Sequence, residues 1–180
     1  MRRGHVSRIN CNMNDFAFHP EDKARSLIDR RLLACGWLIQ SKAEMNLGAG
    51  LGVAVREFQT ASGPVDYGLF VGRKPCGVIE AKAEGTTLSG FSEQAARYIA
   101  DVPKHLVREE GQVRFEYVAS GTETLFRDHT DPDPVSRRVF SFHRPETLER
   151  ELREPLTLRG RLRPCRRSSP TACAPARSTL

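Results

Sequence analysis

The chain has 180 residues and a formal net charge of +6, which allows one domain with a hydrophobic core but not two large ones. Arginines in residues 1–12 and 161–180, where no acidic residue occurs, contribute +8, so residues 13–160 carry a net charge of −2. Composition therefore does not identify the body of the chain as a basic DNA-binding module.

Two patterns bear on the cellular compartment. The five cysteines show no CxxC pairing, which argues against a structural zinc site or a disulfide framework and favours a reducing cytoplasm. No apolar run approaches the ~20 residues of a membrane span, and the arginines near Met1 are not followed by the apolar segment of a signal peptide. We expect a cytoplasmic protein without a membrane partner.

The first predicted element is a helix over residues 20–35. Pro20 at the first turn favours helix initiation, and an apolar stripe at helical spacing continues until Gly36, a favourable C-terminal stop. The stripe consists of Ala24, Leu27, Ile28, Leu32 and Cys35. Glu21 fits the positive helix end and is a weaker candidate for a catalytic carboxylate.

The glycines of residues 48–52 precede a predicted strand over residues 53–58. A phosphate-binding loop needs glycines between a strand and a helix N-terminus. We therefore interpret them as a flexible turn, and with no GxxxxGK(S/T) sequence in the chain we expect no ATP site.

The next two predicted strands, residues 65–71 and 76–82, are separated by the turn formers of residues 72–75 and preceded by a turn at residues 63–64. If the pairing is symmetric about residue 73, Asp66 lies directly opposite Glu80, with Cβ atoms roughly 5 Å apart. Period-two geometry places Lys82 on the same face as Glu80.

Two carboxylates and an ammonium group on one patch of sheet have two interpretations. Asp66 could cap a turn, with Glu80 and Lys82 at a solvated edge. Alternatively, a cation between the carboxylates would offset their repulsion, since hard oxygen ligands suit Mg²⁺ and a neighbouring lysine can stabilise charge.

Beyond the hairpin, the pattern predicts a helix over residues 89–100, a strand over residues 113–119, and short strands near Phe126 and residues 139–142. Gln94 and Tyr98 are four apart and share a face of that helix. Residues 128–134 contain potential metal ligands, but Asp-Pro repeats are above all turn formers. We interpret His143 and Arg144 as loop residues available for a phosphate contact.

The chain is predicted to comprise a disordered N-terminal extension (1–12), one central domain (13–160) and a disordered tail (161–180). The tail from Pro164 onward lacks apolar periodicity.

Several separated sequence segments resemble a known family. Asp66 and Glu80-Ala81-Lys82 are similar to the PD-(D/E)xK nuclease motif, with Val65 where that motif often has proline. Further segments, found in the same order between about Pro20 and about Arg163, resemble the N-terminal endonuclease region of the restriction (R) subunit of type I restriction–modification enzymes. These segments are residues 52–58, 77–82, 121–124 and 142–148, together with a Q-x-x-x-Y motif at Gln94 and Tyr98.

The resemblance implies an α/β fold, with a restriction-endonuclease-like mixed central sheet flanked by helices, and Mg²⁺-dependent hydrolysis of DNA phosphodiesters. Asp66, Glu80 and the carbonyl of Ala81 would hold the metal, and Lys82 would position water or stabilise charge on the phosphate. Gln94 and Tyr98 would bind DNA or order the site. The implied partners are DNA and the methylase and specificity subunits.

The tail, read one frame over, resembles the linker that leads into the ATP-driven motor of the same family, so we expect a truncated or frameshifted R subunit. Two alternatives remain. One is a non-catalytic nuclease-like module that docks to the methylase–specificity complex or binds DNA without cutting. The other is a soluble α/β domain without a nucleic-acid role.

Overall fold

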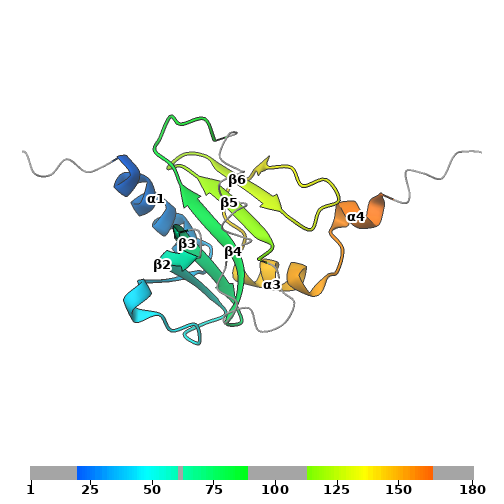
Figure 1. The fold of residues 1–180 in the computed structure, drawn as a ribbon, viewed down its shortest axis with the longest axis horizontal. Coiled ribbons are helices and arrows are strands. Elements are labelled where there is room, and N and C mark those ends of the chain that lie inside the picture. The colour runs from blue at the N-terminus through cyan, green and yellow to red at the C-terminus, as the bar shows by residue number, and fades with distance from the viewer. Residues whose placement is uncertain (1–19, 61–62, 89–112, 164–180) are drawn as a thin grey trace, which may run out of the picture.

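The computed structural model describes residues 20–60, 63–88 and 113–163. These residues form a mixed sheet of seven strands in the order β1 to β7, with α1 and α4 on opposite sides of it in Figure 1. The strands β1–β2 and β4–β5 pair in parallel, and the other neighbours pair antiparallel. The α/β prediction with a mixed central sheet is confirmed.

The elements follow in chain order. The first half consists of α1 (Pro20–Ala34), β1 (Leu38–Gln40), the 3-10 helix η1 (Lys42–Glu44), β2 (Gly52–Thr60), β3 (Gly63–Val71) and β4 (Lys74–Ala81). The second half consists of β5 (Phe115–Ala119), β6 (Thr124–Asp128), β7 (Arg137–Arg138), α3 (Pro145–Arg153) and α4 (Leu158–Leu162). Within these ranges no helix is both long and apolar enough to cross a membrane.

Helix α1 ends as its sequence predicts. Gly36 has φ +88°, its N–H bonds to the carbonyl of Leu33, and the N–H of Trp37 bonds to the carbonyl of Leu32. This hydrogen-bond pattern is a Schellman motif, which satisfies the last carbonyls of a helix. The tight stop turns the chain into β1, which the sequence analysis missed because only three residues form it.

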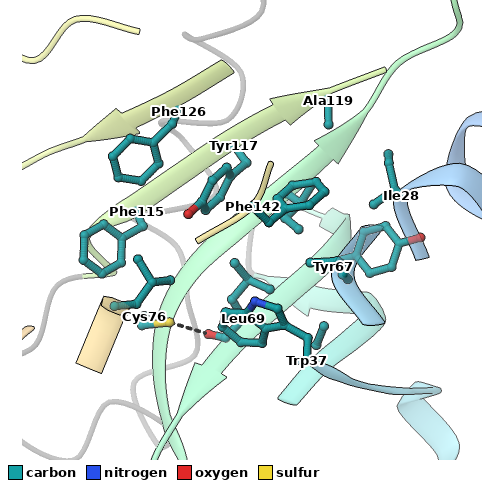
Figure 2. Packing of buried hydrophobic residues seen from close by; sticks show 14 of the residues in the cluster. Ile28, Trp37, Tyr67, Leu69, Cys76, Phe115, Tyr117, Ala119, Phe126 and Phe142 are labelled. Atoms are coloured by element: carbon teal, nitrogen blue, oxygen red, sulfur yellow. Dashed lines mark hydrogen bonds between the residues drawn. The ribbon is translucent and has the colours of Figure 1, made fainter. Parts of the chain in front are cut away.

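The main core lies between one face of the sheet and the helices α1 and α3. Ile28 and Leu32 of α1 and Leu148 of α3 are fully buried in one cluster with residues of β2 to β6. Figure 2 shows the aromatic part of this cluster and the Sγ of Cys76, which lies 3.4 Å from the carbonyl oxygen of Leu69. This packing fixes α1 against the strands that carry the predicted site.

Several local predictions were wrong. Gly63, Pro64, Lys74 and Pro75 were assigned to turns but belong to β3 and β4. The segment after β7 forms no further strand, and residues 145–153 form α3, which was not predicted. Pro at the first turn and Glu146 next to it are favourable helix-start signals that the sequence analysis overlooked.

Helix α4 includes Arg161 and Leu162, which the sequence analysis assigned to the tail. The Thr157 side chain caps the N-terminus of this helix by accepting a hydrogen bond from the N–H of Gly160 at 3.1 Å. The remainder of the tail and the predicted N-terminal extension lie outside the described residues.

Candidate functional site

The β3–β4 hairpin sets the site through its turn and a bulge. Gly72 and Arg73 have φ +55° and +71°, the conformation of a two-residue type I′ turn. Near this turn Val71 pairs with Lys74, but after an irregularity next to Leu69 the register shifts by one, and Tyr67 pairs with Ile79. Continued by one residue, this register brings Asp66 opposite Glu80.

The bulge is therefore decisive for the site. Without the shift, Glu80 would face Val65, and a slip of one residue exchanges the two faces of a strand. Pro75 pairs beside the irregularity, where a residue without an N–H is tolerated. The predicted symmetry about residue 73 is found at Tyr67 and Ile79, although the two-residue turn itself is shorter than predicted.

Asp66, Glu80 and Lys82 line one cleft of about 500 Å³ at this end of the hairpin. The other lining residues come from α1, the segment starting with η1, and the strands β2 to β4: Arg25, Lys42, Glu57, Gln59, Pro64, Val65 and Ala81. The structure thus brings the three residues singled out from the sequence to one side of the sheet.

The Asp66 carboxylate is held by two groups. Its Oδ1 accepts hydrogen bonds from Nε of Arg25 at 2.9 Å and contacts Nη2 of Arg25 at 2.6 Å. Its Oδ2 accepts a hydrogen bond from the backbone N–H of Ala81 at 2.8 Å. The second bond connects β3 to β4 at the place where the ladder ends, and it aims the carboxylate at the strand that carries Glu80.

Glu80 is 7% exposed, and its Oε1 accepts a hydrogen bond from Nζ of Lys82 at 2.8 Å. Burial raises the pKa of Glu80 by more than the adjacent Lys82 ammonium lowers it, and the negative charge of Asp66 adds a smaller rise. A buried carboxyl group with a raised pKa in a cleft is a common feature of functional sites.

Two cleft residues were missed as site residues in the sequence analysis, Arg25 and Glu57. Arg25 lies 41 positions before Asp66, and only the packing of α1 against the sheet brings them together. Glu57 follows Arg56 in β2 with φ +51°, rare for a residue with a side chain. Simple alternation from Val53 and Val55 predicts a charge on an apolar face at Glu57, which was an available signal, although in the structure Phe58 joins that cluster instead.

A hydrogen-bond network fixes α1 beside the cleft. The Tyr67 hydroxyl donates to Oδ1 of Asp29 at 2.8 Å, and Arg56 forms an ion pair with the same carboxylate. The hydroxyl also lies 3.2 Å from the carbonyl oxygen of Arg25. Burial, followed by the bond to Asp29, raises the pKa of Tyr67 far above its ordinary value. The network locates the Arg25 backbone next to Asp66.

Other sequence candidates have different outcomes. Gln94, Tyr98 and the helix predicted to carry them lie outside the described residues, as does the side chain of Glu21. The His143 ring contacts the Tyr117 hydroxyl at 2.6 Å through Nδ1, and its carbonyl accepts a hydrogen bond from Nε1 of Trp37. Arg144 is the N-cap residue of α3.

The Asp128–Pro134 segment is tied together by local pairs. Asp128 binds Arg114 through two hydrogen bonds, and Asp131 binds Arg137. The Nε2 of His129 lies 2.6 Å from Oε2 of Glu116. Across the described ranges, no three His, Cys, Asp or Glu side chains converge as a metal cluster, so a cation at the cleft would rely on two carboxylates and a backbone carbonyl.

Three comparisons with known proteins agree. Residues 45–127 match the model of the type I restriction enzyme EcoKI endonuclease subunit second domain. The chain is 27% identical, over an alignment of 178 residues, to the type I restriction enzyme EcoKI endonuclease subunit of Escherichia coli K12. It is also similar, with a TM-score of 0.55 and 20% identity, to a fragment of a putative HsdR subunit of a type I restriction enzyme from Vibrio vulnificus YJ016.

The sequence and structure matches cover most of this chain but only a small part of each relative. The alignment with the Escherichia coli protein includes 71% of this chain but 15% of that protein. The structural match includes 76% of this chain and 26% of the Vibrio vulnificus fragment. The chain therefore spans a small part of its relatives, and the structural match at this identity concerns the fold.

Proposed function

We propose that this chain, which is similar to part of a type I restriction enzyme endonuclease or HsdR subunit in all three comparisons, is a Mg²⁺-dependent DNA endonuclease domain with a restriction-endonuclease-like fold. One observation carries the proposal: Asp66 and Glu80, from neighbouring strands, line one cleft with Lys82. Two carboxylates that share a cleft repel each other, and a bound cation would offset this repulsion.

The donor set fits a hard divalent cation. Asp66 and Glu80 supply carboxylate oxygens, which Mg²⁺ prefers, and Ala81 between Glu80 and Lys82 supplies a backbone carbonyl. The carboxylates already attract the guanidinium of Arg25 and the ammonium of Lys82. When bound, Mg²⁺ would supply Lewis-acid activation of the scissile phosphate and of water.

Lys82 would act on the reacting phosphate. Hydrolysis forms a bond between a water oxygen and phosphorus and breaks one phosphorus–oxygen ester bond, so negative charge develops on the phosphate oxygens. The ammonium group of Lys82, held 2.8 Å from Glu80 at the cleft, would stabilise this charge and position the water. Glu80 in turn would orient Lys82.

The remaining assignments extend the same proposal. Gln94 and Tyr98 would bind DNA or order the site, as the resemblance implies. DNA and the methylase and specificity subunits would be the partners. We expect weak or absent cleavage by the isolated chain, because residues 13–160 are net acidic and provide little phosphate affinity.

The experiment is thermal unfolding of the purified chain with and without Mg²⁺ or Mn²⁺. We expect the cations to raise the midpoint temperature, because they bind the folded state, and Asp66→Ala or Glu80→Ala to abolish the increment. Asp133→Ala, which removes an exposed acid in the Asp128–Pro134 segment, is the matched control and should retain it.

A nicking assay on plasmid DNA completes the test. Any nicking should disappear with Lys82→Ala. Nicking that persists in the Asp66→Ala, Glu80→Ala and Lys82→Ala variants would locate the chemistry elsewhere. If cations raise the midpoint temperature but no nicking occurs, even when the methylase and specificity subunits are present, the result would favour the non-catalytic module.

A further inference from the structure

Arg25 occupies the carboxylate that the proposed cation would need. Its Nε and Nη2 are 2.9 and 2.6 Å from Oδ1 of Asp66, and Oδ2 of Asp66 is bonded to the backbone N–H of Ala81. Both oxygens therefore already have partners. A divalent cation that binds Oδ1 competes with Arg25, and one that binds the remaining lone pair of Oδ2 is repelled by the adjacent guanidinium.

Glu57 provides another position for the displaced side chain. In the β2–β3 register, Arg56 pairs with Tyr67 and Phe58 with Val65, so Glu57 lies opposite Asp66. Glu57 is exposed, and among the described residues its carboxylate forms no hydrogen bond or ion pair. Glu57 and Arg25 line the 500 Å³ cleft together and share a second, adjoining cavity of about 280 Å³.

The backbone of Glu57 is strained. A φ of +51° in a residue with a side chain is unfavourable and persists where the surrounding structure imposes it, often at functional sites. Glu57 lines the cleft, where its negative charge attracts Arg25. No contact of Glu57 within the described residues explains why it is kept there.

We propose that Arg25 is a displaceable latch, which pairs with Asp66 in the cation-free protein and transfers to Glu57 when a divalent cation binds. This inference rests on the proposed function. The transfer needs only a side-chain movement, because the Tyr67–Asp29–Arg56 network holds the helix. The Arg25 side chain is 37% exposed, which leaves room to move. Arg25 and Glu57 are thus positioning residues, which set the cation affinity of Asp66 and Glu80.

The test measures Ca²⁺ and Mn²⁺ binding by titration calorimetry, without a need for cleavage. We expect Arg25→Met to raise the affinity roughly three- to fivefold, within the factor that a partly exposed ion pair supplies. Lys23→Met removes a positive charge from the same helix, where it pairs with Glu84 and not with Asp66, and it should leave the affinity within twofold. Arg25→Gln serves as a second variant if Arg25→Met unfolds, as judged by urea denaturation.

A double-mutant cycle tests the acceptor. Glu57→Gln should lower the affinity in the wild-type background, because the displaced Arg25 loses its alternative partner. In the Arg25→Met background the same substitution should have no effect. An equal loss in both backgrounds would instead make Glu57 a direct ligand and overturn the latch.

Two further outcomes separate the hypotheses. Unchanged or weaker binding in both Arg25 variants, or an equal gain with Lys23→Met, would overturn the latch while the cation site stands. Binding that is unaffected by Asp66→Ala and Glu80→Ala would overturn the proposed cation site itself, and with it the latch.

Discussion

Two clusters of buried charge lie at opposite ends of the sheet. The Asp66–Glu80–Lys82 cluster adjoins Ala81, which pairs with Ala119 at one end of β5. The Arg114–Asp128 cluster lies at the other end, where Asp128 pairs with Phe115. In the second cluster, Arg114 donates from Nε and Nη2 to the two oxygens of Asp128 at 2.9 and 2.8 Å. Its Nη1 donates to carbonyl oxygens at the end of α3. Asp128 also accepts hydrogen bonds from Thr130.

The pKa directions of the two clusters are opposite. Burial alone would raise the pKa of Asp128, but hydrogen bonds from Arg114 and Thr130 outweigh burial and lower it. For Glu80, burial exceeds the effect of Lys82 and raises the pKa. The surroundings of Asp128 thus favour its charged form, whereas those of Glu80 disfavour it, and a bound cation would offset the cost of charging Glu80.

The largest expected loss of stability follows from removing Arg114 from the Arg114–Asp128 cluster. Arg114→Met should cost about 3–5 kcal/mol of unfolding free energy, because it leaves the buried Asp128 carboxylate without its partner. Arg25→Met should cost clearly less, since its ion pair with Asp66 is partly exposed. Urea denaturation of both variants gives the comparison.

Arg138→Met is the control, because its pair with Glu123 is on the surface and contributes about 0–1 kcal/mol. Equal costs for Arg114→Met and Arg25→Met would remove the distinction between a structural and a displaceable pair.

The Asp66–Glu80–Lys82 cluster was more predictable from the sequence than the Arg114–Asp128 cluster. Asp66 and Glu80 come from one hairpin, where turn residues and apolar runs define both strands and a symmetric pairing relates them. That prediction succeeded because a bulge corrected the register set by the two-residue turn. The bulge itself carries no clear sequence signal, so the right pairing was obtained with the wrong turn.

Long-range partners were not predictable in this way. Arg25 reaches Asp66 only because α1 packs across the sheet, and Arg114 reaches α3 across 37 positions. An arginine in a helix or next to a strand is most often solvated, and nothing local distinguishes these two. Glu57 is intermediate, because strand alternation could have identified it, while its positive φ could not be predicted.

A smaller effect is expected from the network that connects α1 to the cleft. Tyr67→Phe removes the hydroxyl that donates to Asp29 and should cost about 1 kcal/mol, the net value of a hydrogen bond, in urea denaturation. Asp29 keeps Arg56 as a partner, so the helix should stay in place and Ca²⁺ affinity should stay within twofold. A large change in affinity would mean that the position of Arg25 depends on this one bond.

The smallest effect, a difference in pH dependence, sharpens the comparison most. The folded-state pKa of Glu80 is raised, so the folded protein gains stability relative to the Glu80→Gln variant as pH falls through that pKa toward the ordinary Glu value of about 4.3. The folded-state pKa of Asp128 is lowered. Its stabilisation is therefore complete above the ordinary Asp value of about 3.9 and is lost as pH falls through the folded pKa.

Urea denaturation of wild type, Glu80→Gln and Asp128→Asn across acidic and neutral pH measures both differences. Glu80→Gln should have its greatest advantage over wild type at neutral pH and lose it on acidification. Asp128→Asn should have its full deficit at neutral pH and recover only at the most acidic values. Because the two predictions have opposite signs, a general acid effect on the fold cannot produce both. A Glu80→Gln variant that is least stable relative to wild type at neutral pH would show that Lys82 fully compensates Glu80, and the contrast between the clusters would disappear.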